Sequence, residues 1–239
     1  MNNLVFLDTE TTGNDLLKDR LFQVCYSYNN KIHSEYFKPP LPISIKAQSI
    51  THITNKMIED EQEFSSSSMK KDLEELLKNN ILVAHNASFD IHMLGMEGIQ
   101  VDKFICTLKV TRFLDEEGLI PEYNLQYLRY YLELDVIVDA HDAKSDVLVL
   151  EALFMSLFEQ MLKIYGSEDK VIEKMIEVSV NPFLIKFFNF GKYKGRAVEE
   201  IIVLDKGYLE WLLNQKMQNS NFEADEDWIF TLKSHLKIS

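Results

Sequence analysis

The chain has 239 residues, 46% of them hydrophobic, so it can bury a sizeable core without disulfide or metal staples. Its formal net charge of −13 argues against a protein that coats nucleic acid passively, because nonspecific affinity comes mainly from lysines and arginines that neutralise phosphates. Cys25 and Cys106 lie in apolar surroundings, and neither a signal peptide nor a membrane-spanning stretch is apparent, so we expect a reduced, cytoplasmic protein that makes no membrane contact.

The chain opens with β-branched and aromatic runs that predict three strands, at residues 4–8, 20–28 and 31–37. The last two are separated by Asn29-Asn30, which favours a hairpin turn. A Pro-rich stretch at 38–44 ends this antiparallel meander.

Helical spacing begins at residues 68–80, and a buried strand is predicted at 81–85. From Ala87 onward helical patterns alternate with short apolar runs and end in a long apolar helix at 142–163. Three strands followed by alternating helices and strands predict an α/β fold, with helices packed on a mixed β-sheet.

A domain boundary is predicted where the apolar spacing weakens, between residues 165 and 182, which end in Asn-Pro. We therefore expect a catalytic domain at 1–166 and a small α+β accessory module at 167–239.

Two carboxylates stand at the end of the first predicted strand. Asp8 and Glu10 are two residues apart, so both side chains point to one face, with Cα atoms roughly 6.6 Å apart at about 3.3 Å per residue. Taken alone, this pattern is also ordinary turn chemistry at a strand end.

Two further acidic residues begin helices. Asn86 is predicted to cap a helix that starts at Ala87, which places Asp90 in its first turn, where pairing with the positive helix terminus is an alternative role. Asp146 lies one turn into the long apolar helix. His141 stands five residues earlier, about 140° away on a regular helix, so it must precede that helix to face the same site.

The four carboxylates are more informative together than singly. Two carboxylates at 4 Å repel by about 4 kcal/mol at an effective dielectric of 20, so a buried cluster needs cations or raised pKa values. With two hard divalent cations the same oxygens become ligands for phosphodiester displacement, and oxygen-only ligands favour Mg²⁺ or Mn²⁺ over zinc.

Three motifs resemble, in order and context, the exonuclease motifs of the DnaQ-like (DEDD) superfamily: DTETTG (8–13), VAHNASFD (83–90) and AHDAKSD (140–146). The spacing from His141 to Asp146 is that of its histidine branch. The C-terminal stretches FNFGKYKGRAVEEI and GYLEWLL resemble an extension that a bacterial branch of the superfamily carries.

The resemblance implies an RNase H-like mixed β-sheet flanked by helices and a 3′→5′ exonuclease that acts on DNA, with DNA repair as its setting. Asp8, Glu10, Asp90 and Asp146 would hold two Mg²⁺ ions, for which Mn²⁺ can substitute. His141 would take a proton from the attacking water, and nucleoside 5′-monophosphates would leave from the 3′ end.

Substrate contacts follow from the same resemblance. Candidates for the terminal nucleotide are Thr9, Thr11, Thr12, Ala47, His52, Asn86 and Phe89. Phe89 is first of all a core anchor, and His52 stands one residue beyond the position that carries a histidine in the family.

A basic stretch in the C-terminal module suggests a second nucleic-acid contact. The basic residues are interleaved with Phe190 and Tyr193, a pattern that suits a strand backbone and stacked bases, and they are Lys186, Lys192, Lys194 and Arg196. The alternative is a glycine-punctuated turn whose basic side chains are simply solvated.

Several functional alternatives stay open at this point. No residue distinguishes DNA from RNA, so an exoribonuclease or a polymerase-proofreading subunit fits as well. A non-catalytic nucleic-acid-binding protein would be favoured if the acidic residues failed to bind metal. A homodimer is compatible with the sequence.

Overall fold

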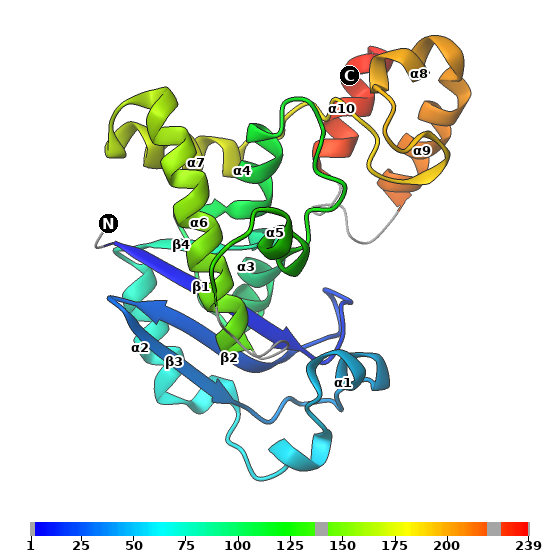
Figure 1. Ribbon diagram of the computed structural model, residues 1–239. Helices are drawn as coiled ribbons and strands as arrows, with labels where there is room; N and C mark the ends of the chain where they lie inside the picture. Colours follow the sequence, from blue (N-terminus) through cyan, green and yellow to red (C-terminus); the bar gives the residue numbers. More distant parts are fainter. Residues whose placement is uncertain (1–2, 137–142, 219–225, 239) are drawn as a thin grey trace.

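The computed structural model describes residues 3–136, 143–218 and 226–238. Five strands form one sheet: β1 (Leu4–Thr11), β2 (Leu21–Tyr28), β3 (Lys31–Tyr36), β4 (Ile81–Ala84) and β5 (Phe104–Cys106). Their order across the sheet is β3-β2-β1-β4-β5. The β1-β2 and β2-β3 pairs are antiparallel, and the β1-β4 and β4-β5 pairs are parallel. The predicted mixed sheet is therefore confirmed (Figure 1).

The α-helices are α1 (Ile45–Thr51), α2 (Ser68–Leu77), α3 (Ala87–Met96), α4 (Thr107–Leu114), α5 (Leu125–Tyr131), α6 (Ala143–Tyr165), α7 (Glu168–Val180), α8 (Val198–Leu204), α9 (Lys206–Gln218) and α10 (Glu226–Leu236). Short 3₁₀ turns lie at Asn55–Ile58, Phe64–Ser66 and Gly191–Tyr193. The strands and helices predicted within residues 1–166 are present, with bounds that differ by a few residues.

The β2-β3 hairpin shows why the chain reverses where it does. Asn29 and Asn30 both have positive φ, 50° and 61°, the left-handed region that asparagine tolerates better than most residues. A two-residue turn of this kind matches the twist of the strands that it joins. The hairpin predicted from Asn29-Asn30 is thus confirmed.

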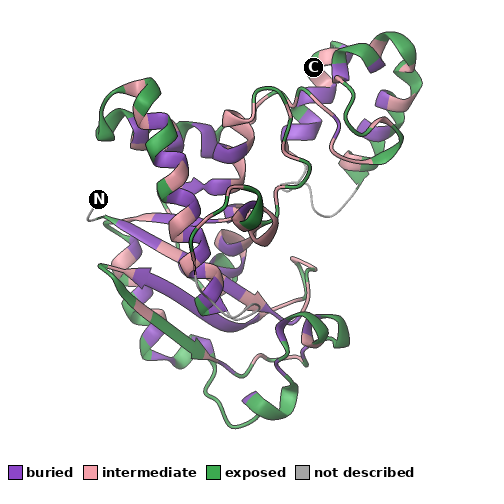
Figure 2. Cartoon of the chain, in the orientation of Figure 1, coloured by how far each residue is buried: buried purple, intermediate pink, exposed green. Residues whose placement is uncertain are grey.

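The sheet is the middle of three layers (Figure 1). One face packs against α4, α5, α6 and α7, around buried residues such as Leu153, Phe154 and Leu157. The other face packs against α2 and α3, whose Leu73 and Leu94 are fully buried. Figure 2 shows β1 and β2 buried along most of their length, as expected for central strands covered on both faces.

Helix α7 belongs to this first unit. Its Val171, Met175 and Val178 are buried in the same cluster as α6, and the helix contacts β5 and α4. Packing therefore places the division between the units after Val180, beside the Asn-Pro pair, which lies within the predicted range of 165–182 but later than the expected domain boundary at residue 166. The apolar spacing of α7 is looser because only one stripe of the helix meets the core.

The C-terminal module has a separate core formed by α8, α9 and α10, with Phe188, Leu209 and Trp228 among its buried residues. Where an α+β module was expected, its described residues contain no strand, and a single β-bridge joins Phe187 to Ala197. Gly191 and Gly195, with φ of 67° and 81°, supply left-handed backbone in the turn that connects these two residues.

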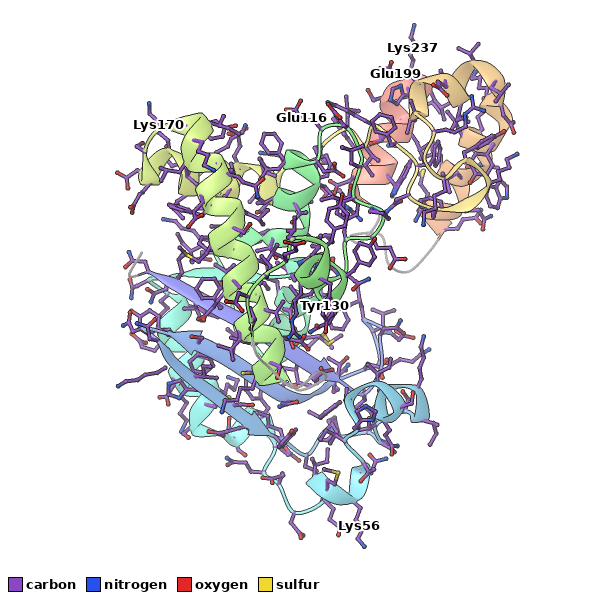
Figure 3. All side chains as sticks on the ribbon, in the orientation of Figure 1. Lys56, Glu116, Tyr130, Lys170, Glu199 and Lys237 are labelled. Carbon is purple, nitrogen blue, oxygen red and sulfur yellow. The ribbon has the colours of Figure 1, made fainter. Side chains whose placement is uncertain are left out.

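Charged and polar side chains extend outward from both units (Figure 3), where Lys56, Glu116, Tyr130, Lys170, Glu199 and Lys237 are labelled. Among the residues that the structure describes, no helix is long and apolar enough to cross a membrane. Both cysteines are buried and free, as expected.

Ser179 connects α7 to the edge of the sheet, and its removal should destabilise the first unit. Its hydroxyl donates to the Met175 carbonyl and accepts from the backbone N–H of Cys106 at 2.7 Å. We predict that Ser179→Ala lowers the free energy of unfolding by about 1–3 kcal/mol, because a buried N–H loses its acceptor. Denaturant unfolding measures the change. Ser49→Ala is the control, since that exposed hydroxyl only donates to a carbonyl of its own helix. Equal effects of the two substitutions on the free energy of unfolding would contradict the prediction.

Candidate active site

Strand β1 carries Asp8 and Glu10 on the face that meets α6. Phe6, on the same face, packs edge-on against Phe154 of α6 with ring centroids 5.3 Å apart. The pairing of β1 with β4 ends at Phe6, so Asp8 and Glu10 lie beyond the carboxyl end of that parallel pair. In sheets of this kind, ligands bind where the carboxyl ends of parallel strands meet.

Helix α6 brings the third carboxylate to this point. Asp146 lies in its first turn, and oxygen atoms of Asp8, Glu10 and Asp146 all lie within 4.8 Å of one another. The amide of Gln126, from α5, donates a hydrogen bond to Asp146 Oδ1. Sequence reasoning did not select Gln126; its place in the first turn of a short helix capped by Asn124 was the available signal.

The fourth carboxylate approaches from the opposite layer. Asp90 is buried in the first turn of α3, and its Oδ1 accepts a 2.7 Å hydrogen bond from the hydroxyl of Thr9. Thr9 points to the opposite side of β1 from Asp8 and Glu10, so one strand holds carboxylates from two layers. Helix α3 begins at Ala87 as predicted, with Asn86 at its N-cap position in a left-handed conformation, φ 66°, but the Asn86 side chain makes no capping hydrogen bond.

Burial and mutual repulsion raise the pKa values of this cluster. Desolvation raises the pKa of Asp8 well above its usual value, and the charges of Asp90, Glu10 and Asp146 raise it further, in that order. Desolvation raises the pKa of Asp90 to about 7, although the Thr9 hydrogen bond opposes the shift. Asp90 therefore titrates near neutrality when no metal is bound.

His141, the predicted general base, lies outside the described residues. His85 lies near the site but is unsuited to that role, because both ring nitrogens are engaged. Its Nε2 donates to the Tyr123 carbonyl at 2.6 Å, which leaves Nδ1 to accept from the Thr107 hydroxyl at 2.9 Å. Desolvation lowers its pKa to about 4, so the ring stays neutral and positions the Tyr123 loop.

The carboxylates fit divalent cations. The three clustered donors are all oxygen, and their spacing suits one ion or a close pair. Hard oxygen ligands of this kind favour Mg²⁺ or Mn²⁺. Asp8, Glu10 and Asp146 would hold such ions, with Asp90 beside Asp8.

The threonines predicted to contact substrate have structural partners. Thr9 binds Asp90, Thr12 donates to Asp19 Oδ1 at 2.7 Å, and Thr11 donates to the Gly13 carbonyl. The Thr12 backbone is also used, because its N–H donates to Arg20 and its carbonyl accepts from Ser44. Because these three hydroxyls already donate hydrogen bonds within the protein, they are less available to bind the 3′ end of a nucleic-acid strand.

The other candidate contacts differ in exposure. Ala47 is buried in a small cluster with Phe22 and Ile43, whereas His52 is exposed at the end of α1 in a left-handed conformation, φ 59°. Phe89 packs against the core of the second face, in agreement with its reading as an anchor.

Most of the basic stretch in the module is locally neutralised. Lys192 pairs with Asp205 at 2.8 Å and lies over the rings of Tyr193 and Tyr208. Arg196 pairs with Glu200 at 2.9 Å. Lys194 is exposed and forms no ion pair within the described ranges, so it is the cation of this stretch best placed for an outside ligand.

Comparison with known proteins assigns both units. A model of the exonuclease family matches residues 5–154, and a model of the exodeoxyribonuclease X-like C-terminal domain matches residues 188–216. Exodeoxyribonuclease 10 of Escherichia coli strain K12 is 32% identical over 192 residues, which cover 76% of each chain. The DNA polymerase III epsilon subunit of Treponema pallidum is 28% identical over 186 residues, 71% of this chain and 85% of its own.

Solved structures agree with this. Exonuclease X in complex with 5′ overhanging duplex DNA has a TM-score of 0.56 and 26% identity, covering 74% of this chain and 99% of that chain. E. coli exonuclease I in complex with an oligonucleotide has a TM-score of 0.55 at 18% identity, covering 73% and 43%, a likeness of fold alone. The chain belongs to the exonuclease family and has its DnaQ-like, RNase H-like fold, with an exodeoxyribonuclease X-like module at the C-terminus.

The raised pKa values predict how stability depends on pH and metal. A carboxyl group with a folded pKa of about 7 and an unfolded pKa of about 3.9 makes the metal-free fold lose stability as pH rises between those values. Mg²⁺ binds the ionised carboxylates, so we predict that it raises the melting temperature more at about pH 8 than at about pH 5. Thermal unfolding in EDTA and in Mg²⁺ measures this. Asp90→Asn should flatten the dependence of melting temperature on pH in EDTA. If the wild-type melting temperature in EDTA does not change with pH over this range, the titration of Asp90 is not the cause.

The Thr9 hydrogen bond should tune the same equilibrium. It stabilises ionised Asp90, so Thr9→Val should raise the pKa of Asp90 above about 7. We predict that the pH at which Mg²⁺ gives half its maximal stabilisation rises by about one to two pH units, since hydrogen bonds to charged groups are worth about 1.5–3 kcal/mol. Thr111→Val is the matched control, because that buried hydroxyl donates to the neutral Thr107 carbonyl. A similar rise in Thr111→Val would count against the assignment.

Proposed function

We propose that this protein is a 3′→5′ exodeoxyribonuclease that uses two divalent ions, Mg²⁺ or Mn²⁺. The observation that carries the proposal is the convergence of Asp8, Glu10 and Asp146 within 4.8 Å, with buried Asp90 beside Asp8. Four carboxylates at the carboxyl end of parallel strands, with the pKa values of Asp8 and Asp90 raised, fit a cation site for phosphodiester hydrolysis better than they fit a structural role.

The relatives support DNA as the substrate. The E. coli relative is named exodeoxyribonuclease 10, and the structural neighbours were solved with duplex DNA and with an oligonucleotide. A role in DNA repair and release of nucleoside 5′-monophosphates from the 3′ end form part of the proposal.

Each residue of the site has a distinct task. The four carboxylates hold the cations, which when bound supply positive charge beside the phosphate and make water more acidic. His141 accepts the proton of the attacking water, whose oxygen bonds to phosphorus as the bond to the 3′ oxygen of the preceding nucleotide breaks. Gln126 and Thr9 are positioning residues that fix Asp146 and Asp90.

A labelled strand tests the reaction. With Mg²⁺, a 5′-labelled single-stranded DNA should give a ladder of shortened products ending in 3′-hydroxyls. We predict that Asp146→Asn abolishes the ladder and that His141→Ala lowers kcat about 10²–10⁴-fold, the range for loss of a general base. Denaturing gels of time courses measure both effects.

Matched controls make this test specific. Asp169→Asn, in the first turn of α7, and His33→Ala, on the exposed edge strand, remove the same groups outside the site and should keep wild-type rates. Products with 3′-phosphates, or cleavage that persists in EDTA, would overturn the mechanism. Equal degradation of a labelled RNA would replace the deoxyribonuclease assignment, and metal binding without cleavage would favour a non-catalytic nucleic-acid-binding protein.

A further inference from the structure

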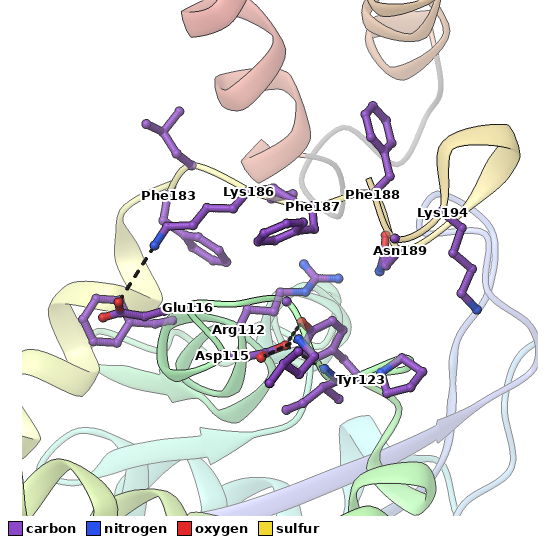
Figure 4. A pocket seen from close by; sticks show the side chains of 18 of the residues that line it. Arg112, Asp115, Glu116, Tyr123, Phe183, Lys186, Phe187, Phe188, Asn189 and Lys194 are labelled. Atoms are coloured by element: carbon purple, nitrogen blue, oxygen red, sulfur yellow. Dashed lines mark hydrogen bonds and ion pairs between the residues drawn. The ribbon is translucent and has the colours of Figure 1, made fainter. Parts of the chain in front are cut away.

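A cleft of about 370 Å³ lies where the C-terminal module meets the first unit. One wall is the segment 112–123 that follows and includes the end of α4, and the other is the segment 183–189 with Lys194 and Trp228. Figure 4 shows Phe183 and Phe187 on the module side of this cleft, opposite Arg112 and Tyr123. Its size is in the range of small-ligand sites.

The first wall is held in shape by its own hydrogen bonds. The Asp115 carboxylate accepts from the Tyr123 hydroxyl at 2.6 Å and from the backbone N–H groups of Leu119 and Ile120 at 2.8 and 3.0 Å. Arg112 lies over the Tyr123 ring, 5.3 Å from its centroid, and also faces Asp227 of α10 at 3.8 Å. This wall is therefore already formed before any ligand enters.

A glycine sets how closely the second wall approaches. Gly118 has a φ of 66°, and a Cβ built there would lie 2.5 Å from the ring of Phe187. The module thus rests directly on a bare backbone, which brings the aromatic residues of the module and Tyr123 to opposite sides of one space.

Two polar groups that line the cleft, Lys194 and Asn189, match the chemistry of a nucleotide. Lys194 lines the cleft and forms no ion pair within the described ranges, so it offers a cation for a phosphate. Asn189 lines it too, and its buried Oδ1 has no hydrogen-bond partner among the described residues, so it can accept from the amino group of a base. Aromatic faces beside a cation are the features that bind unpaired nucleotides.

The cleft is connected to the active site through Tyr123. The Tyr123 carbonyl accepts from His85, which follows β4, and Gln126, three residues further along the chain, donates to Asp146. Three residues span at most about 11 Å of extended chain, so the cleft wall begins close to the carboxylates.

We propose that this cleft binds one unstacked nucleotide of the substrate strand, on the 5′ side of the phosphate that is cleaved. Lys194 contacts the phosphate of that nucleotide, Asn189 accepts from its base, and the aromatic walls cover the base. The inference rests on the proposed exonuclease function and assigns to the C-terminal module a share in holding the strand.

An abasic scan tests the proposal with the full-length protein. Binding of 5′-fluorescein single strands is measured by anisotropy with Ca²⁺ in place of Mg²⁺, each strand lacking one base at a successive distance from the 3′ end, and gels verify that the strands stay intact. We expect one position upstream of the terminal nucleotide to weaken binding about 5- to 100-fold when its base is missing, the effect of losing one stacked base.

Two variants locate that position in the cleft. Asn189→Leu should reduce the sensitivity at that position, because the base loses its hydrogen-bond acceptor while the aromatic walls remain, whereas Asn214→Leu, an exposed asparagine of α9, should keep it in full. Lys194→Gln should weaken binding of all strands and reduce the slope of log affinity against log salt by about one. Lys206→Gln, whose lysine pairs with Glu210 outside the cleft, is its control.

The outcomes separate this inference from the proposed function. A flat abasic scan, or a position-specific loss that Asn189→Leu leaves unchanged, overturns the cleft assignment while Mg²⁺-dependent shortening still supports the exonuclease. A flat scan together with tight binding of a nucleoside 5′-monophosphate, lost in Lys194→Gln, means that the cleft binds free nucleotide and also overturns it. Absence of shortening by the wild-type protein instead refutes the proposed function.

Discussion

The repulsion among four carboxylates in a desolvated site is the constraint on which the rest of this fold depends. Asp8 experiences the charges of Asp90, Glu10 and Asp146 at once, and burial removes the water that would weaken them. Only a rigid scaffold can keep such groups together without a bound cation. The buried sheet with helices on both faces provides that rigidity, because the strands and the first turns of α3 and α6 cannot move apart without exposing core residues.

Strand β1 is the element that joins the two halves of the site. Its alternation sends Asp8 and Glu10 toward α6 and Thr9 toward α3, so a single strand fixes the approach of helices from opposite layers. The two carboxylates that come from helices each accept a hydrogen bond from a neutral donor: Asp90 from Thr9, and Asp146 from Gln126. A lysine in either place would compete with the cation, whereas a hydroxyl or an amide orients the carboxylate and leaves its charge available.

The sequence predicted the sheet, the long helix and the acidic cluster because each depends on local periodicity or on a motif with fixed spacing. Asn29-Asn30, Asp8 with Glu10, and the apolar stripe of α6 all carry that information within a few residues. The boundary between the two units was harder to predict, because the apolar residues of α7 are loosely spaced although one side of the helix is buried. Gln126 was missed, and the ion pair of Lys192 with Asp205 was not foreseen, since both contacts depend on where segments distant in the sequence meet.

The hydroxyl of Ser179 has a consequence for how this protein behaves at high concentration. An open sheet has two borders whose unpaired N–H and C=O groups can recruit a strand from another molecule. Here one border is the three-residue β5, where Ser179 and α7 cover the Cys106 N–H. The other is β3, whose exposed Lys31 and Glu35 disfavour a neighbouring copy. Both borders are thus guarded against self-association into fibrils, and weakening α7 would uncover one of them.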